Sequence, residues 1–276
     1  MAIKLDLANA FDRLRHSFVI LVLKSFGFPE TFILQVQACI TSPWIAPLIN
    51  GRPSTFFKAS RGVRQGCPLS PFLYILVADS LSRRLNRLHA EGSLPGLSFR
   101  GSVPPINHAL FTDDTILLGV ASPQIARNFL RPLDNFLSSS GSSVNFQKSQ
   151  IFGWNCPPAT LCSISQILKI KANPNWTHFT YLGIPVVKKT LTSSMWNPVI
   201  QKIKDKIHSL GSKWLNLAGK TVLIKSILSS YPIYLSSMVL APRNVIISIC
   251  KELRKFLWQG GKVQTKKFHL VKWETV

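Results

Sequence analysis

The 276-residue sequence has few acidic residues: 11 Asp and Glu stand against 33 Lys and Arg, which leaves a formal net charge of +22. So basic a surface attracts polyanions, which means nucleic acid or an anionic membrane face. Only 16% of the residues are charged and 46% are hydrophobic, and this balance excludes an intrinsically disordered chain. The length suits one large domain or two modest ones.

Cysteine is also scarce, because the chain holds only five, scattered singly along its length. They form no C-x-x-C pair with a matching set of His residues. Their odd number and wide spacing exclude both a disulfide framework and a zinc module, and they favour a reducing compartment.

The sequence lacks a secretory signal, because Lys4 and Asp6 interrupt any apolar stretch near Met1. The best candidate for a membrane span is the uncharged run 226–242, which is rich in serine and broken by Pro232. It is shorter than the ~20 apolar residues that a span needs. We therefore expect an intracellular protein, in the nucleus or cytoplasm, without a membrane partner.

Strand-like and helix-like apolar spacings mix along the first two thirds of the chain, and no internal repeat is present. Strands are expected at 3–7, at 45–57 as a pair around Asn50-Gly51, and at 108–112, 115–118, 149–154 and 181–185. Helices are expected at 13–26, from 29 onward, at 71–89 with Pro71 as the first helical residue, and at 124–137.

The last third of the chain differs from the rest in pattern and in charge. From about residue 193 its apolar spacing is helical, and residues 188–276 hold 16 basic but only 3 acidic residues. The sequence therefore predicts an α+β domain over residues 1–187 and a basic helical domain over residues 188–276.

Three acidic residues, Asp6, Asp113 and Asp114, each lie at a strand end or turn within apolar sequence. Asp is a common turn former, so the Asp113-Asp114 pair alone is weak evidence of function. Carboxylates held side by side need a neutralising cation, and oxygen ligands from adjacent strands suit Mg²⁺. Two such ions can activate a 3′-hydroxyl and stabilise a leaving pyrophosphate. A glycoside hydrolase would also use paired acids, but it needs neither the basic charge nor the Gln65-Gly66 loop.

The segment Lys4-Leu5-Asp6-Leu7-Ala8-Asn9-Ala10-Phe11-Asp12 resembles the first catalytic motif of the reverse transcriptases of non-LTR (LINE-type) retrotransposons. Further motifs follow in the family's order over nearly the whole chain. The resemblance implies that Asp6 ligates metal, that Leu7 offers a carbonyl ligand, and that Phe11 rejects a 2′-hydroxyl. Without the motif, Phe11 could equally be an aromatic residue of the core.

The segment Arg61-Gly62-Val63-Arg64-Gln65-Gly66-Cys67-Pro68-Leu69-Ser70-Pro71 resembles the second motif, with the spacing Gln-Gly-x-x-x-Ser-Pro intact. By itself it could be a glycine-proline loop that leads into a helix. Gly66 would allow close approach of the backbone, while Gln65, Arg61 and Arg64 offer donors to template or nucleotide.

Three later segments extend the resemblance. Phe111-Thr112-Asp113-Asp114 is similar to the catalytic hairpin, with Thr112 where the family usually has Ala. Residues 141–149 resemble the motif whose lysine, here Lys148, helps pyrophosphate to leave, although Lys148 could equally be a solvated surface residue. Tyr181-Leu182-Gly183-Ile184-Pro185 looks like the primer-grip hairpin, and apolar clusters at 214–225 and 256–258 resemble the thumb.

The resemblance implies a polymerase palm, an antiparallel sheet backed by helices, followed by a mostly helical thumb-like region. It implies RNA-directed DNA polymerisation with two Mg²⁺ ions, or Mn²⁺, held by Asp6, Leu7, Asp113 and Asp114. The partners would be an RNA template, a DNA primer and deoxynucleoside triphosphates.

The chain departs from the family in beginning at the first catalytic motif. We therefore expect the fingers to be absent and to be supplied by a longer polyprotein, and we expect little activity from the chain in isolation. The alternative hypothesis is a catalytically dead retrotransposon remnant that only binds nucleic acid through its charge.

Overall fold

A computed structural model describes residues 1–98, 103–189, 192–209 and 215–259. The chain divides into two compact units, Met1–Trp176 and Thr177–Val276. The division predicted at residues 187 and 188 stays a prediction. Among the described residues, no helix is both long enough and apolar enough to span a membrane.

The first unit is built on a mixed sheet whose main path runs β10-β9-β1-β7-β6, while β8 pairs with the end of β1. Its strands are β1 (Ala2–Ala8), β6 (His108–Phe111), β7 (Asp114–Leu118), β8 (Ser143–Val144), β9 (Gln150–Phe152) and β10 (Lys171–Asn173). Every pairing is antiparallel except that between β9 and β10. The central strand, β1, therefore has β7 on one side and β8 and β9 on the other.

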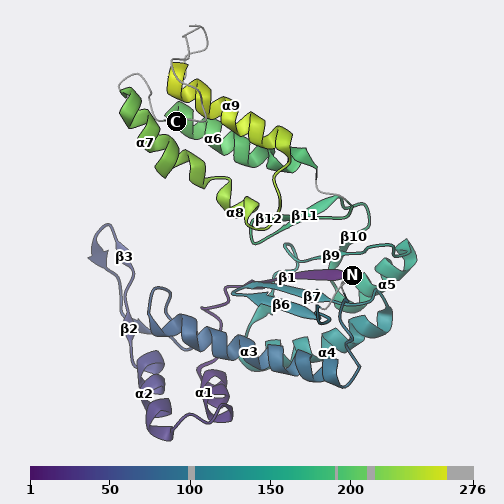
Figure 1. The fold of residues 1–276 in the computed structure, drawn as a ribbon. Helices are drawn as coiled ribbons and strands as arrows, with labels where there is room; N and C mark the ends of the chain where they lie inside the picture. Colours follow the sequence, from purple (N-terminus) through teal and green to yellow (C-terminus); the bar gives the residue numbers. More distant parts are fainter. Residues whose placement is uncertain (99–102, 190–191, 210–214, 260–276) are drawn as a thin grey trace. The chain divides into compact units, whose positions relative to one another are not determined.

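The helices among the described residues of this unit are α1 (His16–Ser25), α2 (Glu30–Thr41), α3 (Leu69–Ala90), α4 (Pro123–Ser140) and α5 (Pro158–Leu168). Helices α3 and α4 lie along one face of the sheet (Figure 1). The predicted α+β fold, an antiparallel sheet backed by helices and followed by a mostly helical region, is confirmed.

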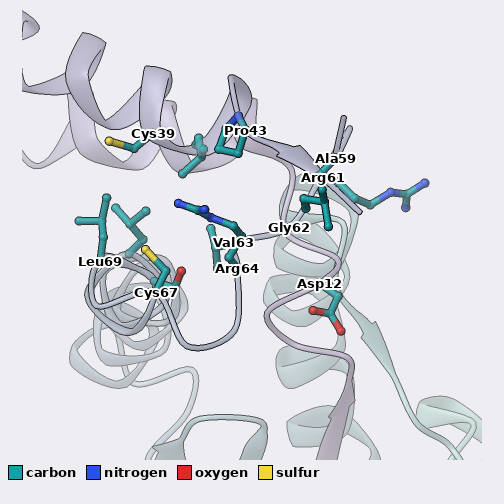
Figure 2. Close-up of a pocket in the computed structure, with 14 residues that line it drawn as sticks. Asp12, Cys39, Pro43, Ala59, Arg61, Gly62, Val63, Arg64, Cys67 and Leu69 are labelled. Atoms are coloured by element: carbon teal, nitrogen blue, oxygen red, sulfur yellow. The ribbon is translucent and has the colours of Figure 1, made fainter. Parts of the chain in front are cut away.

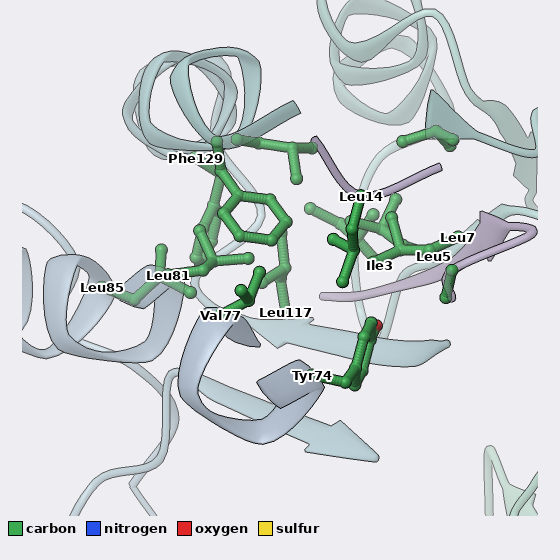
Figure 3. Close-up of a cluster of buried hydrophobic side chains, with 14 of the residues drawn as sticks. Ile3, Leu5, Leu7, Leu14, Tyr74, Val77, Leu81, Leu85, Leu117 and Phe129 are labelled. Carbon is green, nitrogen blue, oxygen red and sulfur yellow. The ribbon is translucent and has the colours of Figure 1, made fainter. Parts of the chain in front are cut away.

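Strand β1 shows why the sheet has two chemically different faces. Ile3, Leu5 and Leu7 are buried and pack in the core against α3 and α4, as Figure 3 shows. Because successive side chains of a strand point to opposite faces, Asp6 lies on the other face, as its spacing predicts. The core thus fixes the direction in which the Asp6 carboxylate points.

The segment between α2 and α3 forms two small ribbons in place of one predicted hairpin. Strands β2 (Trp44–Ile45) and β5 (Phe57–Lys58) make one ribbon, and β3 (Leu48–Ile49) and β4 (Arg52–Pro53) make the other. The tip is the predicted Asn50-Gly51 turn, where both residues have positive φ, 50° and 77°.

The second unit begins with the hairpin β11 (His178–Tyr181) and β12 (Ile184–Val187) and continues with helices. The helices are η1 (Ser193–Trp196), α6 (Asn197–Ser209), α7 (Leu217–Ser226), η3 (Leu228–Ser230), α8 (Ile233–Ser236) and α9 (Arg243–Gln259). Their core includes the fully buried side chains of Trp196, Leu228 and Phe256.

One local prediction was wrong, and one helix was not predicted. Pro71 is the third residue of α3 and not the first, because Pro68 already has helical φ and ψ at the N-cap. Helix α5 was not anticipated, although Pro158 opens it and Leu161, Ile164 and Leu168 have helical spacing.

Candidate active site

The candidate site is centred on the pairing of β1 with β7. The two strands are antiparallel, and Asp6 lies directly opposite Asp114 in their register. Side chains of directly opposed residues share one face of a sheet, so the two carboxylates are neighbours. Each has a cationic neighbour: Lys148 Nζ is 3.7 Å from Asp6 Oδ2, and Lys4 Nζ is 3.8 Å from Asp114 Oδ1.

Asp113 lies in the two-residue turn between β6 and β7. Its backbone carbonyl accepts a hydrogen bond from the Leu7 N–H of β1 at 3.0 Å. The Thr112 hydroxyl donates to Asp113 Oδ1 at 2.8 Å, and Thr112 itself has a φ of +51°. The turn is therefore attached to the end of β1, beside the strand that carries Asp6.

A cavity of about 570 Å³ brings together residues from all the predicted motifs of the first unit. The predicted site residues that line it are Asp6, Leu7, Phe11, Arg64, Gln65, Gly66, Asp113 and Lys148. Asp114 and Arg61 are not among its lining residues, and Tyr181, Leu182 and Gly183 belong to the second unit. Eight residues from four separate segments of the sequence thus surround one space.

The loop before α3 is held against the segment that follows β1. The Gly62 N–H donates to the Leu14 carbonyl, and the Val63 N–H donates to the Phe11 carbonyl. Gly62 has a φ of +86°, and a Cβ there would lie 2.6 Å from the Asp12 carbonyl oxygen. Only glycine fits that position without a shift of the backbone.

Gln65 and Gly66 of the same loop line the large cavity. Gln65 Nε2 donates to the Asp12 carboxylate at 3.2 Å. Gly66 has a φ of +82°, and no atom lies within 4 Å of where its Cβ would be. The space beside Gly66 is therefore open, as close approach of a ligand to the backbone requires.

The two arginines of the loop are placed differently. Arg64 lines both the large cavity and a smaller one of about 150 Å³ between α2 and the start of α3. Of these two cavities Arg61 lines the smaller one, and its guanidinium extends away from it in Figure 2. Cys67 also lines the smaller cavity, and hydrogen bonding to the Leu69 backbone lowers the pKa of its thiol.

Three residues that the sequence reasoning missed hold the predicted ones in place. Asn145 and Ser149 bracket Asp6: the Asn145 N–H donates to the Asp6 carbonyl at 2.8 Å, and the Asp6 N–H donates to Ser149 Oγ at 3.1 Å. The third is Tyr74 of α3, whose hydroxyl donates to the Thr112 carbonyl at 2.7 Å. Burial, and the nearby charge of Asp113, raise the pKa of Tyr74 to about 12.

The predicted primer-grip hairpin is well defined within the second unit. Leu182 and Gly183 form its turn with φ of 49° and 77°. The Tyr234 hydroxyl of α8 donates to the Leu182 carbonyl, so the turn is attached to the helices of its own unit.

The donor set around the large cavity suits a hard divalent cation. Asp6 and Asp113 offer carboxylate oxygens, and Mg²⁺ is usually bound by one or two carboxylates with water and substrate phosphates. Among the described residues, no three His, Cys, Asp or Glu side chains form a group that could hold a metal ion by themselves. The residues therefore fit a site that the substrate completes.

Residues 1–186 match the family described as reverse transcriptase (RNA-dependent DNA polymerase), and the chain belongs to this family. Its sheet-and-helix unit is therefore a polymerase palm, as predicted, and the activity of the family is RNA-directed DNA polymerisation.

The curated relatives include Pol proteins of non-LTR retrotransposons, which confirms the resemblance. The chain is 31% identical over 190 residues to the retrovirus-related Pol polyprotein from the type-2 retrotransposable element R2DM of Drosophila melanogaster, covering 65% of this chain and 17% of that one. It is 24% identical over 272 residues to the transposon TX1 149 kDa protein of Xenopus laevis, covering 94% and 19%. The chain thus spans less than a fifth of either relative.

Among solved structures, the chain is similar to the telomerase of Candida albicans in complex with a fragment of telomeric RNA. The similarity has a TM-score of 0.48 and 13% identity, and it covers 93% of this chain and 44% of that one.

Proposed function

We propose that this chain extends a DNA primer on an RNA template, by transferring nucleotides from deoxynucleoside triphosphates to the primer 3′-hydroxyl. The observation that carries the proposal is that Asp6 of β1 and Asp113 of the β6–β7 turn line one cavity in a chain of the reverse transcriptase family. The cavity also collects the aromatic, glycine and lysine residues that nucleotide binding requires.

Asp6 and Asp113 would hold two divalent ions, with the Leu7 carbonyl as a further ligand and Asp114 in support. When bound, Mg²⁺ or Mn²⁺ would supply Lewis acidity to the 3′-hydroxyl and to the leaving pyrophosphate. The chain's own contribution is to hold the carboxylates rigidly, through the backbone bonds of Asp6 and Asp113. Such positioning is most of what a protein contributes to phosphoryl transfer.

Four other lining residues would bind the nucleotide. The Phe11 ring would lie under the sugar and exclude a 2′-hydroxyl by its bulk. Gln65 and Gly66 would contact the base pair or the sugar through an amide donor and an open backbone. Lys148, already next to Asp6, would stabilise the charge of the pyrophosphate as it leaves.

Arg61 and Arg64 would contact template phosphates, and the Tyr181-Leu182-Gly183 turn would contact the primer. We assign residues 1–187 to the palm and residues 188–276 to a thumb-like region, whose basic charge suits a nucleic-acid duplex. We further propose that the protein would act in the nucleus or cytoplasm.

The test is single-turnover extension of a DNA primer on an RNA template by the wild-type chain and by Asp6→Asn and Asp113→Asn. Each substitution keeps the side-chain shape but removes the charge. We expect weak, metal-dependent extension by the isolated wild-type chain and a loss of more than about a hundredfold in both variants. Asp134→Asn, at an exposed position of α4, is the matched control and should leave extension unchanged.

Binding of the same hybrid, measured by fluorescence anisotropy, should be unaffected in all three variants. Extension that persists in Asp6→Asn and Asp113→Asn would contradict the proposal. A wild type that binds the hybrid tightly but never extends it would favour the remnant hypothesis instead.

A further inference from the structure

We propose that Tyr74 is a positioning residue that holds two parts of the site. One is Phe11, the proposed nucleotide gate, and the other is the Thr112-Asp113 turn between β6 and β7. The inference rests on the proposed function, because it assigns Tyr74 a part in the same site. Tyr74 lies on α3, only 4% of its surface is exposed, and it is not among the residues that line the large cavity. It acts through Phe11 and Thr112, which both line the cavity.

The first contact is made by the Tyr74 ring. It stacks on the ring of Phe11, with centroids 4.9 Å apart and planes inclined by 26°. Phe11 is half-buried and lines the large cavity. A gate excludes a 2′-hydroxyl only if its ring cannot retreat, and Tyr74 fills the space into which Phe11 would retreat.

The support behind the gate is itself rigid. Tyr74 belongs to the buried cluster that contains Leu5 and Leu7 of β1, and Figure 3 shows its ring beneath that strand. A side chain enclosed in this way has few alternative rotamers. The ring of Phe11 is therefore fixed from behind by the core of the palm.

The second contact is made by the Tyr74 hydroxyl, which donates to the Thr112 carbonyl at 2.7 Å. Thr112 has a φ of +51°, a conformation that β-branched residues rarely adopt. The next carbonyl, that of Asp113, accepts the Leu7 N–H. Two successive carbonyls of the turn are thus held by two different elements, α3 and β1, and together they fix the orientation of Asp113.

One side chain consequently links the residue proposed to select the sugar with the residue proposed to hold metal. The two contacts use different parts of Tyr74, so substitutions can separate them. Tyr74→Phe keeps the ring and removes the hydroxyl. Tyr74→Leu removes the ring and the hydroxyl together.

The first experiment measures single-turnover extension with deoxynucleotides and with ribonucleotides. For Tyr74→Phe we expect the rate of deoxynucleotide addition to fall about three- to tenfold, because the Thr112 carbonyl loses its donor, while discrimination against ribonucleotides is kept. For Tyr74→Leu we expect discrimination to fall as well. A purely structural role would lower the melting temperature without this split, and equal kinetic effects in both variants would overturn the proposal.

The matched control is Tyr231→Phe, which removes a hydroxyl from a half-buried tyrosine in the second unit and should change neither quantity. A second readout does not depend on activity. Amide hydrogen exchange across residues 108–118 should be about three- to tenfold faster in Tyr74→Phe than in the wild type, and unchanged in Tyr231→Phe. Unchanged exchange in Tyr74→Phe would overturn the inference, whereas a wild type without extension would count against the proposed function alone.

Discussion

The two units of the chain differ in charge and in secondary structure. Met1–Trp176 holds eight of the 11 acidic residues and 17 basic ones, whereas Thr177–Val276, little more than half as long, holds three acidic and 16 basic residues. The first unit contains the sheet, the cavity and the strained turns, and the second contains mostly helices. Chemistry at defined positions needs a rigid sheet, whereas attraction of a polyanion needs only charge on a stable support.

This difference is visible in the backbone. In the first unit, Thr112 and Gly62 have positive φ beside the cavity, and long-range hydrogen bonds hold both segments. In the second unit, the described positive-φ residues are those of the hairpin turn, Leu182 and Gly183. Strained conformations therefore gather in the unit that contains the candidate active site, as they do where geometry serves function.

The strongest test of the division is the independence of the two cores. Phe129 in the first unit and Phe256 in the second are both fully buried. We expect Phe129→Ala and Phe256→Ala each to cost about 3–5 kcal/mol of unfolding free energy. Each should lower only one of two transitions in scanning calorimetry. A single transition that both variants lower equally would show that the units unfold as one.

A somewhat smaller effect should separate two glycines of the same loop. Gly62→Ala and Gly66→Ala each place a side chain at a left-handed φ, which costs about 1–2 kcal/mol. At Gly62 the new Cβ also meets the Asp12 carbonyl oxygen at 2.6 Å, so we expect a total of about 3 kcal/mol. Urea unfolding measures both. Equal midpoints for the two variants would mean that the loop adapts and that geometry matters less in the first unit.

The third test concerns charge. Replacing Lys202, Lys204 and Lys206 of α6 with Gln should weaken binding of an RNA–DNA hybrid about tenfold and reduce its salt dependence, because fewer counterions are released. The matched control replaces Arg84, Arg127 and Arg131, three exposed residues on α3 and α4, with Gln. It removes the same charge from the first unit and should change affinity less than twofold. Equal losses would show that binding depends on total charge alone.

Local sequence patterns were sufficient for much of the fold. The alternation of residues 3–7 predicted β1, and helical spacing predicted α3 and α4 to within a few residues. The strand repeat and the helix repeat are both visible within a single element, so neither prediction needs contacts with other elements. The motif resemblance identified the candidate site residues, and eight of them line one cavity. Their roles in catalysis and binding stay proposals.

The supporting residues could not be predicted in this way. No local pattern marks Ser149 as a partner of Asp6, and yet its hydroxyl oxygen accepts a hydrogen bond from the Asp6 N–H, 143 residues away in sequence. Tyr74 looks like any apolar residue of a buried helix, and only the folded chain brings its hydroxyl to Thr112. Such contacts depend on register and packing between elements, which sequence spacing alone does not determine.

The smallest expected effect is on acid stability, and it should arise in the first unit. His108 of β6 is held by Ser82 Oγ at 2.8 Å and by Asn107 Oδ1 at 2.6 Å, and burial lowers its pKa below the ordinary value of 6.5. Below pH 6.5 the unfolded chain therefore binds a proton that the folded chain does not, so stability falls as the pH falls. We expect His108→Gln to lose about 0.5 kcal/mol less than the wild type between pH 6.5 and 5.5.

Chemical denaturation at each pH measures the difference directly. The reason for the difference is that partial burial of the His108 imidazole beside α3 disfavours its charged form. A pH profile of His108→Gln that matches the wild-type profile would show that acid sensitivity does not arise at the α3–β6 contact of the first unit.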